Sequence, residues 1–116
     1  MCGLAGWIGL GPTIDRTQRL ALGTAMSNSL IHRGPDDGGV WCDEEGLVIA
    51  HRRLAILDLS ARGHQPMLDA TGQHVLVYNG ELYNYRELRI ELDGDDADTF
   101  QSESDSEVVL QALIRW

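Results

Sequence analysis

The sequence contains little cysteine and no long apolar run. Only two of its 116 residues are cysteines, Cys2 and Cys42, which is too few for the disulfide framework of a chain this size. No apolar run approaches the ~20 residues that a helix needs to cross a bilayer. No basic segment precedes an apolar stretch at the N-terminus, as one does in a signal peptide. We therefore expect a cytoplasmic protein with reduced thiols and no membrane partner.

Positive charge is also scarce. Nine basic residues stand against eighteen acidic ones, and the formal net charge is −9. This argues against a nucleic-acid partner, because that affinity depends on Lys and Arg neutralising phosphates. The acidic run at 93–98 is most simply a solvated loop, and the alternative, a calcium site, lacks the EF-hand spacing. The histidines and cysteines show no zinc spacing, so we expect no metal site.

The remaining features are those of an ordinary globular domain. The chain is 43% apolar and 23% charged, as soluble domains usually are, and its length allows at most one domain, 1–116. Hydrophobic patterns and turn residues predict an α+β fold. The predicted helices are one that begins at Thr13 or Asp15 and ends near 31, one over 85–92, and one after Ser104. The predicted strands are 4–10, 40–42, 47–51, 74–78 and a short 99–100.

Two of these helices begin with capping signals. Asn84 with Glu87 resembles a capping box, and Ser104 with Glu107 matches the S-x-x-E form. The second box places Asp105 in the first helical turn, where a carboxylate complements the helix dipole. Taken alone, this pattern favours a structural role for Asp105.

The first residues carry a chemical signal. If Met1 is removed, Cys2 holds both a thiol and a free α-amine. A thiolate attacks carbonyls, and an N-terminal amine can be the base that activates a nucleophile. The alternative is that Cys2 is a buried residue of a strand, as cysteine often is. Glycines recur at 3, 6 and 9, and glycine in a strand often marks a close approach of backbone or ligand.

Two adjacent arginines, Arg52 and Arg53, separate the apolar runs 47–51 and 54–58. If one strand includes both runs, neighbouring residues face opposite sides. One arginine then faces solvent and the other faces inward, where it needs a partner, best a carboxylate. The alternative is a loop with two solvated arginines.

The dipeptide Asn79-Gly80 follows the predicted strand 74–78. Asn-Gly after alternating apolar residues is the strongest local hairpin signal. The alternative is functional, because the Asn79 side-chain amide and the Gly80 N–H are suited to donate together to an oxyanion.

Four motifs, taken in order, resemble those of the class II glutamine amidotransferases, which are N-terminal-nucleophile hydrolases. They are the segments 2–7 (CGLAGW), 33–36 (RGPD), 79–84 (NGELYN) and 104–107 (SDSE). The second and third look like the forms found in glutamine-hydrolysing asparagine synthetases. The resemblance implies an antiparallel αββα sandwich, which we expect to be incomplete in this chain.

The resemblance also implies roles for six residues. Cys2 matches the nucleophile, and its α-amine matches the general base. Asn79 and the Gly80 N–H match the oxyanion hole. Arg53 matches the arginine that binds the glutamine α-carboxylate, Asp105 matches the carboxylate that holds the α-ammonium, and Glu81 lies beside it. A zwitterion such as glutamine needs one cation and one anion to orient it.

In such families, ammonia passes to an ATP-using synthetase domain or subunit that makes asparagine from aspartate. The sequence contains no phosphate-binding loop, so we expect ATP and magnesium only in that other part and no cofactor here. The implied partners are glutamine and the synthetase part, with a homo-oligomer as a further possibility. Two alternatives stay open: a non-catalytic fragment or assembly module of the same fold, and an amidotransferase with another ammonia acceptor.

Overall fold

The computed structural model describes residues 1–9, 11, 13–94 and 99–116. Along the chain its elements are β1 (Gly3–Trp7), α1 (Arg16–Ser29), β2 (Asp37–Cys42), β3 (Val48–Arg53), the 3₁₀ turn η1 (Ala61–Gly63), β4 (Met67–Leu68), β5 (Val75–Leu76), α2 (Tyr85–Asp93) and α3 (Asp105–Arg115). Helices occur with antiparallel strand pairs, so the α+β class is confirmed. Of the acidic run 93–98, predicted to be a solvated loop, residues 95–98 lie outside the described residues, and Asp93 is the last residue of α2.

The main sheet has the strand order β1-β3-β2, and both pairs are antiparallel. β1 pairs with β3 so that Gly3 lies opposite Arg52, and β2 pairs with β3 so that Asp37 lies opposite Arg53. β4 and β5 form a second, two-stranded sheet. The register brings the start of β1 to the end of β3, which places Cys2 near Arg53 in space.

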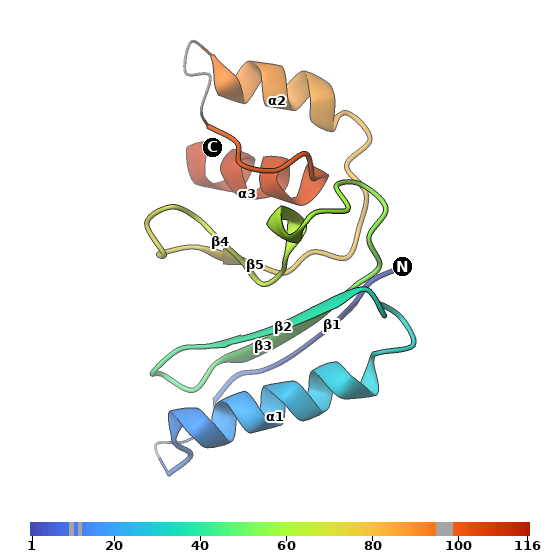
Figure 1. Ribbon diagram of the computed structural model, residues 1–116. Helices are drawn as coiled ribbons and strands as arrows, with labels where there is room; N and C mark the ends of the chain where they lie inside the picture. The colour runs from blue at the N-terminus through green and yellow to red at the C-terminus, as the bar shows by residue number, and fades with distance from the viewer. Residues whose placement is uncertain (10, 12, 95–98) are drawn as a thin grey trace.

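Helix α1 covers one face of the main sheet (Figure 1). Asp15 caps it, since its carboxylate accepts from the Gln18 N–H while the Gln18 side chain accepts from the Asp15 N–H. Gly23 faces the sheet, and a Cβ there would collide with the side chains of Val40 and Val48. The usual cost of a helical glycine, about 1 kcal/mol, is therefore offset by close helix–sheet packing. The core beneath α1 contains Cys42, Val48, Ile14, Leu20, Leu22, Met26 and Val40.

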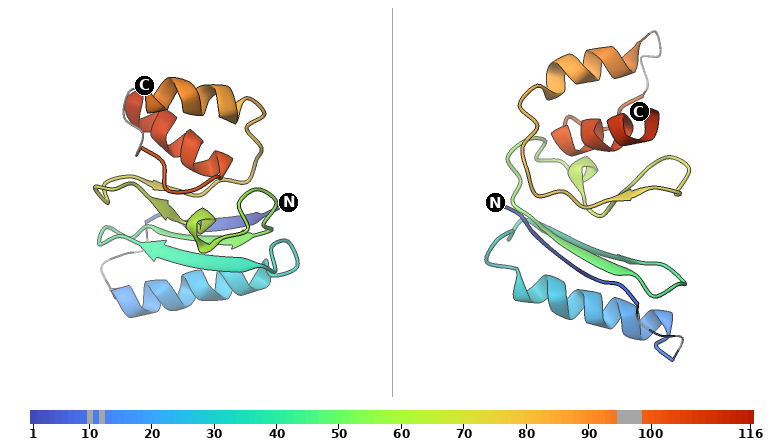
Figure 2. Two further views of the ribbon diagram at one scale, coloured as in Figure 1. Left: turned by 45° about the horizontal axis from the view of Figure 1, so that its top comes forward. Right: turned by 180° about the vertical axis from the view of Figure 1, so that it is seen from behind.

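The elements are arranged in layers (Figures 1 and 2). The β4–β5 ribbon lies beyond the face of the main sheet that α1 leaves open. α3 contacts β5 on the far side of that ribbon, and α2 packs against α3. The family-specific αββα sandwich stays a prediction.

The prediction of a capping box at Asn84 is wrong, although α2 begins at Tyr85 as expected. The Asn84 side chain makes no capping hydrogen bond. Ser104 does cap α3, because its hydroxyl accepts from the Glu107 N–H. The Glu107 carboxylate does not return to the Ser104 N–H; it accepts from the backbone N–H groups that precede it, at Gln101 and Ser102.

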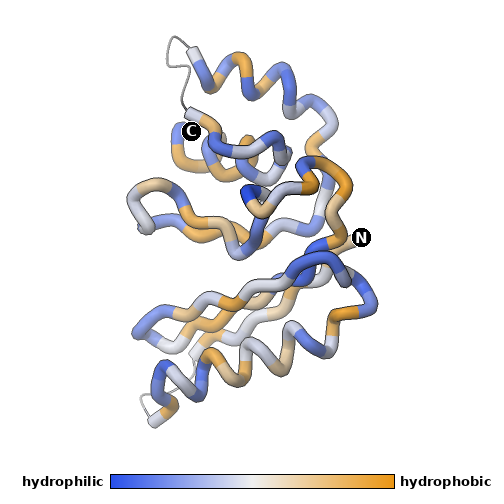
Figure 3. Tube along the Cα trace, viewed as in Figure 1, coloured by the Kyte–Doolittle hydropathy of each residue, from blue (hydrophilic) through white to orange (hydrophobic). Residues whose placement is uncertain are grey.

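The single strand considered over both apolar runs, 47–51 and 54–58, does not form, because β3 ends at Arg53. The following residues form a loop in which Asp58 has a φ of 52°. The carbonyls of Leu57, Asp58 and Ser60 accept hydrogen bonds from the buried Arg53 guanidinium, so they need no strand partner. Figure 3 shows this apolar loop beside the N-terminus.

The other predicted strands are confirmed over shorter or shifted ranges. β1 ends at Trp7 rather than at 10, and the predicted strand 74–78 is paired only over β5. β2 and β3 occupy the predicted positions, and β2 begins earlier, at Asp37. The predicted short strand 99–100 is absent from the described structure, where these residues lie in an irregular segment before α3.

Candidate functional site

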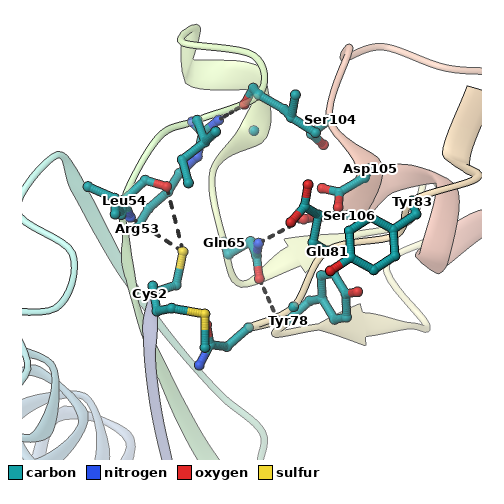
Figure 4. A pocket seen from close by; sticks show the side chains of 16 residues that line it. Cys2, Arg53, Leu54, Gln65, Tyr78, Glu81, Tyr83, Ser104, Asp105 and Ser106 are labelled. Carbon is teal, nitrogen blue, oxygen red and sulfur yellow. Dashed lines mark hydrogen bonds between the residues drawn. The ribbon is translucent and has the colours of Figure 1, made fainter.

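A pocket of about 310 Å³ lies where the N-terminus, the end of β3, the segment after β5 and the start of α3 meet. Figure 4 shows the side chains that line it. The structure brings together around this pocket all six residues singled out from the sequence: Cys2, Arg53, Asn79, Gly80, Glu81 and Asp105. They come from four separate stretches of chain, so their convergence depends on the tertiary fold.

Cys2 lies just before β1 and is half-buried, with a free thiol. The Leu54 N–H donates to the Cys2 Sγ over 3.4 Å, and the Sγ lies 3.7 Å from the Leu54 carbonyl oxygen, as a donor to it. Met1 also lines the pocket. The sulfur is therefore held at the pocket by the first residue after β3.

Arg53 is 6% exposed, and Arg52 is half-buried on the opposite face of the strand. The alternation predicted for the two arginines is therefore present. The predicted carboxylate partner is wrong for Arg53, whose Nη1 and Nη2 donate to the loop carbonyls described above. A guanidinium has five N–H donors, and its hydrogen bonds within the described chain leave the Nε–H and one Nη1–H for a ligand.

The loop that holds Arg53 is itself fixed by Asp58. Its carboxylate accepts from the backbone N–H groups of Ser60 and Glu103, each over 2.9 Å. The Ser60 side chain is the largest cause that holds the pKa of Asp58 below its ordinary value, and the backbone N–H groups of Glu103 and Ser60 act in the same direction, against the opposite effect of burial. Asp58 thus ties the arginine loop to the segment that leads into α3.

Asp105 is the first residue of α3 and is 8% exposed. Its Oδ2 accepts from the Leu82 N–H over 2.9 Å, which ties the segment after β5 to the start of the helix. The N-terminal end of the helix dipole favours its negative charge. The structural role expected for Asp105 is therefore present, and the carboxylate also lines the pocket.

The hairpin alternative for Asn79-Gly80 is wrong. A type I′ turn needs positive φ at both central residues, and neither residue has it. The hairpin is formed instead by β4 and β5, which precede them. Asn79 and Gly80 line the pocket in an irregular segment. The role of this pair as an oxyanion hole stays a prediction.

Tyr78, just before this pair, has a raised pKa. Burial is the largest cause, and the carboxylates of Asp105 and Glu81 add to it. The two carboxylates thus form an acidic side of the pocket, whereas Arg53 supplies a cation from β3 (Figure 4). A cation and an anion in one small pocket suit an amino-acid zwitterion, because its carboxylate binds the cation and its ammonium binds the anion.

Leu54 and Gln65 are among the lining residues that the sequence analysis did not single out. Leu54 contacts the Cys2 sulfur through its backbone N–H and C=O. A sequence pattern does not reveal a backbone contact of this kind. Gln65 is 4% exposed and bonds to Tyr78 and Ser106. A polar amide between turn residues gave no signal, because its partners lie 13 and 41 residues away in the chain.

Within the described residues no group of three or more His, Cys, Asp or Glu side chains is placed to hold a metal ion. No helix in the same described ranges has the length and apolar character to span a membrane.

Comparison with known proteins adds to this geometry. A family model described as a glutamine amidotransferase domain matches residues 1–116. The chain is 37% identical over 118 residues to asparagine synthetase [glutamine-hydrolyzing] 3 of Bacillus subtilis (strain 168), covering 100% of this chain and 18% of that protein. It is 37% identical over 110 residues to asparagine synthetase B [glutamine-hydrolyzing] of Escherichia coli (strain K12), covering 95% of this chain and 19% of that protein. The chain therefore spans about a fifth of these relatives.

Proposed function

This chain belongs to the glutamine amidotransferase domain family, and we propose that its pocket hydrolyses the side-chain amide of glutamine to glutamate and ammonia. The observation that carries this proposal is the convergence of the Cys2 sulfur, the Arg53 guanidinium and the Asp105 carboxylate on one pocket. A nucleophile and two opposite charges are what an amino-acid amide requires.

In the proposed complex, the α-carboxylate of glutamine binds a remaining N–H donor of Arg53. The α-ammonium binds Asp105, with Glu81 beside it. Fixing both charged groups on the α-carbon directs the side-chain amide of the substrate toward Cys2. Such positioning supplies a large part of the rate enhancement of many enzymes.

The proposed reaction begins after removal of Met1, which frees the α-amine of Cys2 as a general base. The sulfur attacks the amide carbonyl and forms a C–S bond, while the amine takes the thiol proton. The oxyanion accepts hydrogen bonds from the Asn79 side-chain amide and the Gly80 N–H. The C–N bond then breaks as the amine returns its proton to the leaving ammonia. Water cleaves the thioester, which releases glutamate and restores the thiol.

We propose further that the ammonia passes to an ATP-dependent synthetase part that converts aspartate to asparagine. The names of the two relatives support this, since they are glutamine-hydrolysing asparagine synthetases of which this chain covers about a fifth. ATP and magnesium would act in that part. The family-specific αββα sandwich belongs to the same proposal, and the observed order of layers supports it.

The test uses the protein expressed from its complete reading frame. Mass spectrometry of the N-terminal peptide should show the loss of Met1. The wild type should release ammonia and glutamate from glutamine. Cys2→Ala should abolish this release, whereas Cys42→Ala, which alters the core below α1, should retain it. Equal release by wild type and Cys2→Ala would refute the mechanism. A folded wild type without glutaminase activity would favour the assembly-module alternative, and asparagine formation separates aspartate from other acceptors.

A further inference from the structure

The backbone of Tyr78 lies beyond the end of β5, which pairs only over Val75–Leu76. Its N–H and C=O therefore lack strand partners, and a buried peptide group without a partner is costly. Two side chains replace the missing partners. The Gln65 Oε1 accepts from the Tyr78 N–H over 2.6 Å, and the His51 Nε2 lies 3.2 Å from the Tyr78 carbonyl oxygen.

Gln65 also reaches the other side of the pocket. Its Nε2 donates to the Ser106 Oγ over 3.1 Å, as Figure 4 shows. One buried amide thus bridges two residues that each neighbour a proposed site residue: Tyr78 precedes Asn79, and Ser106 follows Asp105. The Gln65 side chain is 4% exposed, so little water is available to replace either bond.

We propose that Gln65 is a positioning residue for the amide hydrolysis, acting through the Tyr78 peptide to hold Asn79 and Gly80 in place. This inference rests on the proposed function of the pocket. The acceptor oxygen of Gln65 is taken by the Tyr78 N–H, so its effect on the reaction passes through the chain. Two hydrogen bonds at one buried side chain restrict the motion of the Tyr78 peptide, and the two residues after Tyr78 supply the proposed oxyanion donors.

The histidine supports the same peptide from the opposite side. A carbonyl oxygen only accepts hydrogen bonds, so the His51 Nε2 must carry the proton in the neutral ring. His51 is 0% exposed, and its rigid surroundings in β3 fix the Tyr78 carbonyl to the main sheet. The Tyr78 peptide is therefore tied both to β3 and, through Gln65, to α3.

The test compares Gln65→Met, which keeps similar length but removes both hydrogen bonds, with Gln65→Glu, which keeps an acceptor for the Tyr78 N–H. In Gln65→Met, we expect kcat for glutamine hydrolysis to fall about 10–100-fold, the effect of a small misplacement of reacting groups. KM should change less than about threefold, because Arg53 and Asp105 keep their own anchors. Gln65→Glu should recover most of kcat. Gln73→Met, the same change at an exposed position in the β4–β5 turn, should match the wild type.

Amide hydrogen exchange at Tyr78 supplies a readout that does not need activity. Exchange should be faster in Gln65→Met than in the wild type and unchanged in Gln73→Met. A folded Gln65→Met with wild-type kcat, or with unchanged exchange at Tyr78, would overturn the proposal. If the wild type releases no ammonia, the proposed function fails by itself. If Gln65→Met does not fold, a kcat of Gln65→Glu as low as that of Cys2→Ala would count against the acceptor role.

Discussion

The backbone N–H of Leu54 donates a hydrogen bond to the Cys2 Sγ across 3.4 Å, although 52 residues separate them in the chain. Antiparallel pairing of β1 with β3 brings the two together. Arg53 is the last residue of β3 and Leu54 follows it, so one strand end places both the sulfur and the guanidinium at the pocket. The proposed nucleophile and the proposed carboxylate site therefore share one structural origin.

The two cysteines should differ in their reaction with alkylating agents. Cys2 is half-buried at the pocket, whereas Cys42 is 2% exposed beneath α1. Brief treatment of the native protein with iodoacetamide should add one carbamidomethyl group, at Cys2, as peptide mass analysis would show. Cys2→Ala should take up none under the same conditions, and glutamine should slow the labelling. Equal labelling of both cysteines would contradict this assignment.

Arg53→Lys should raise KM for glutamine by about tenfold or more. Lysine lacks the planar guanidinium with its fixed N–H directions, and a hydrogen bond to a charged group contributes about 1.5–3 kcal/mol. Steady-state glutaminase kinetics measure the change. Arg52→Lys is the matched control, because Arg52 bonds to the Gly34 carbonyl on the other face of the strand. A similar rise in KM for both variants would argue against a specific role for Arg53.

Asp105→Asn should also raise KM, by about the same factor. The amide oxygen can still accept from the Leu82 N–H, so the start of α3 should persist while the negative charge is lost. Asp15→Asn removes a carboxylate from the start of α1, away from the pocket, and asparagine caps helices equally well. That variant should keep the wild-type KM. Circular dichroism would show whether both variants are folded. If they are, and KM is unchanged in Asp105→Asn, another group must bind the ammonium.

Gly63→Ala should weaken glutamine binding without changing any charge. An alanine Cβ there would collide with the Arg53 guanidinium, which must then move from its place in the pocket. We expect a rise in KM of about tenfold, because a displaced guanidinium loses its charge-assisted hydrogen bond with the carboxylate. Gly11→Ala serves as the control, since a Cβ at this position meets nothing within 4 Å. A wild-type KM in Gly63→Ala would show that Arg53 can shift without loss.

Protonation of His51 should lower the stability of the fold in mild acid. Burial is the largest cause that lowers the pKa of His51 below its ordinary 6.5, and its Nδ1 has no hydrogen-bond partner in the described structure. Protonation would therefore leave a buried charge with an unpaired N–H. As the pH falls below 6.5, the unfolded chain binds this proton before the folded chain does, so the free energy of unfolding decreases with falling pH.

Urea unfolding at several pH values measures this effect. His51→Gln can donate to the Tyr78 carbonyl without titrating, so its stability should fall less than that of the wild type from pH 6.5 downward. His32→Gln, at an exposed position, should retain the wild-type pH dependence. Parallel curves for His51→Gln and the wild type would refute this role.

Local patterns predicted the elements of this fold better than their contacts. Alternation along β3 correctly predicted opposite faces for Arg52 and Arg53, because that pattern depends only on strand geometry. The partner of Arg53 was not predictable from this pattern, since it depends on a loop turned by the positive φ of Asp58. Similarly, Asp15 caps its helix as expected, whereas Asn84 does not, because a capping sequence fixes neither the side-chain rotamer nor the approach of the chain.

In the site too, local patterns predicted individual residues but not their contacts. A family resemblance assigned its six residues, of which Cys2, Asn79 and Gly80 were also indicated by their chemistry, and the structure brings all six to one pocket. The support from Gln65 required tertiary information, because each of its hydrogen bonds joins segments that are distant in sequence. Sequence motifs thus indicated the groups that face the pocket but not those that hold them.

The peptide groups of Leu54 offer the Cys2 sulfur one donor and one acceptor. A protonated thiol can donate to the carbonyl, and an ionised sulfur can accept from the N–H. During a catalytic cycle the sulfur would lose and regain its hydrogen while the same residue stays beside it. The main chain at this point is therefore suited to both ionisation states, and no side chain has to move between them.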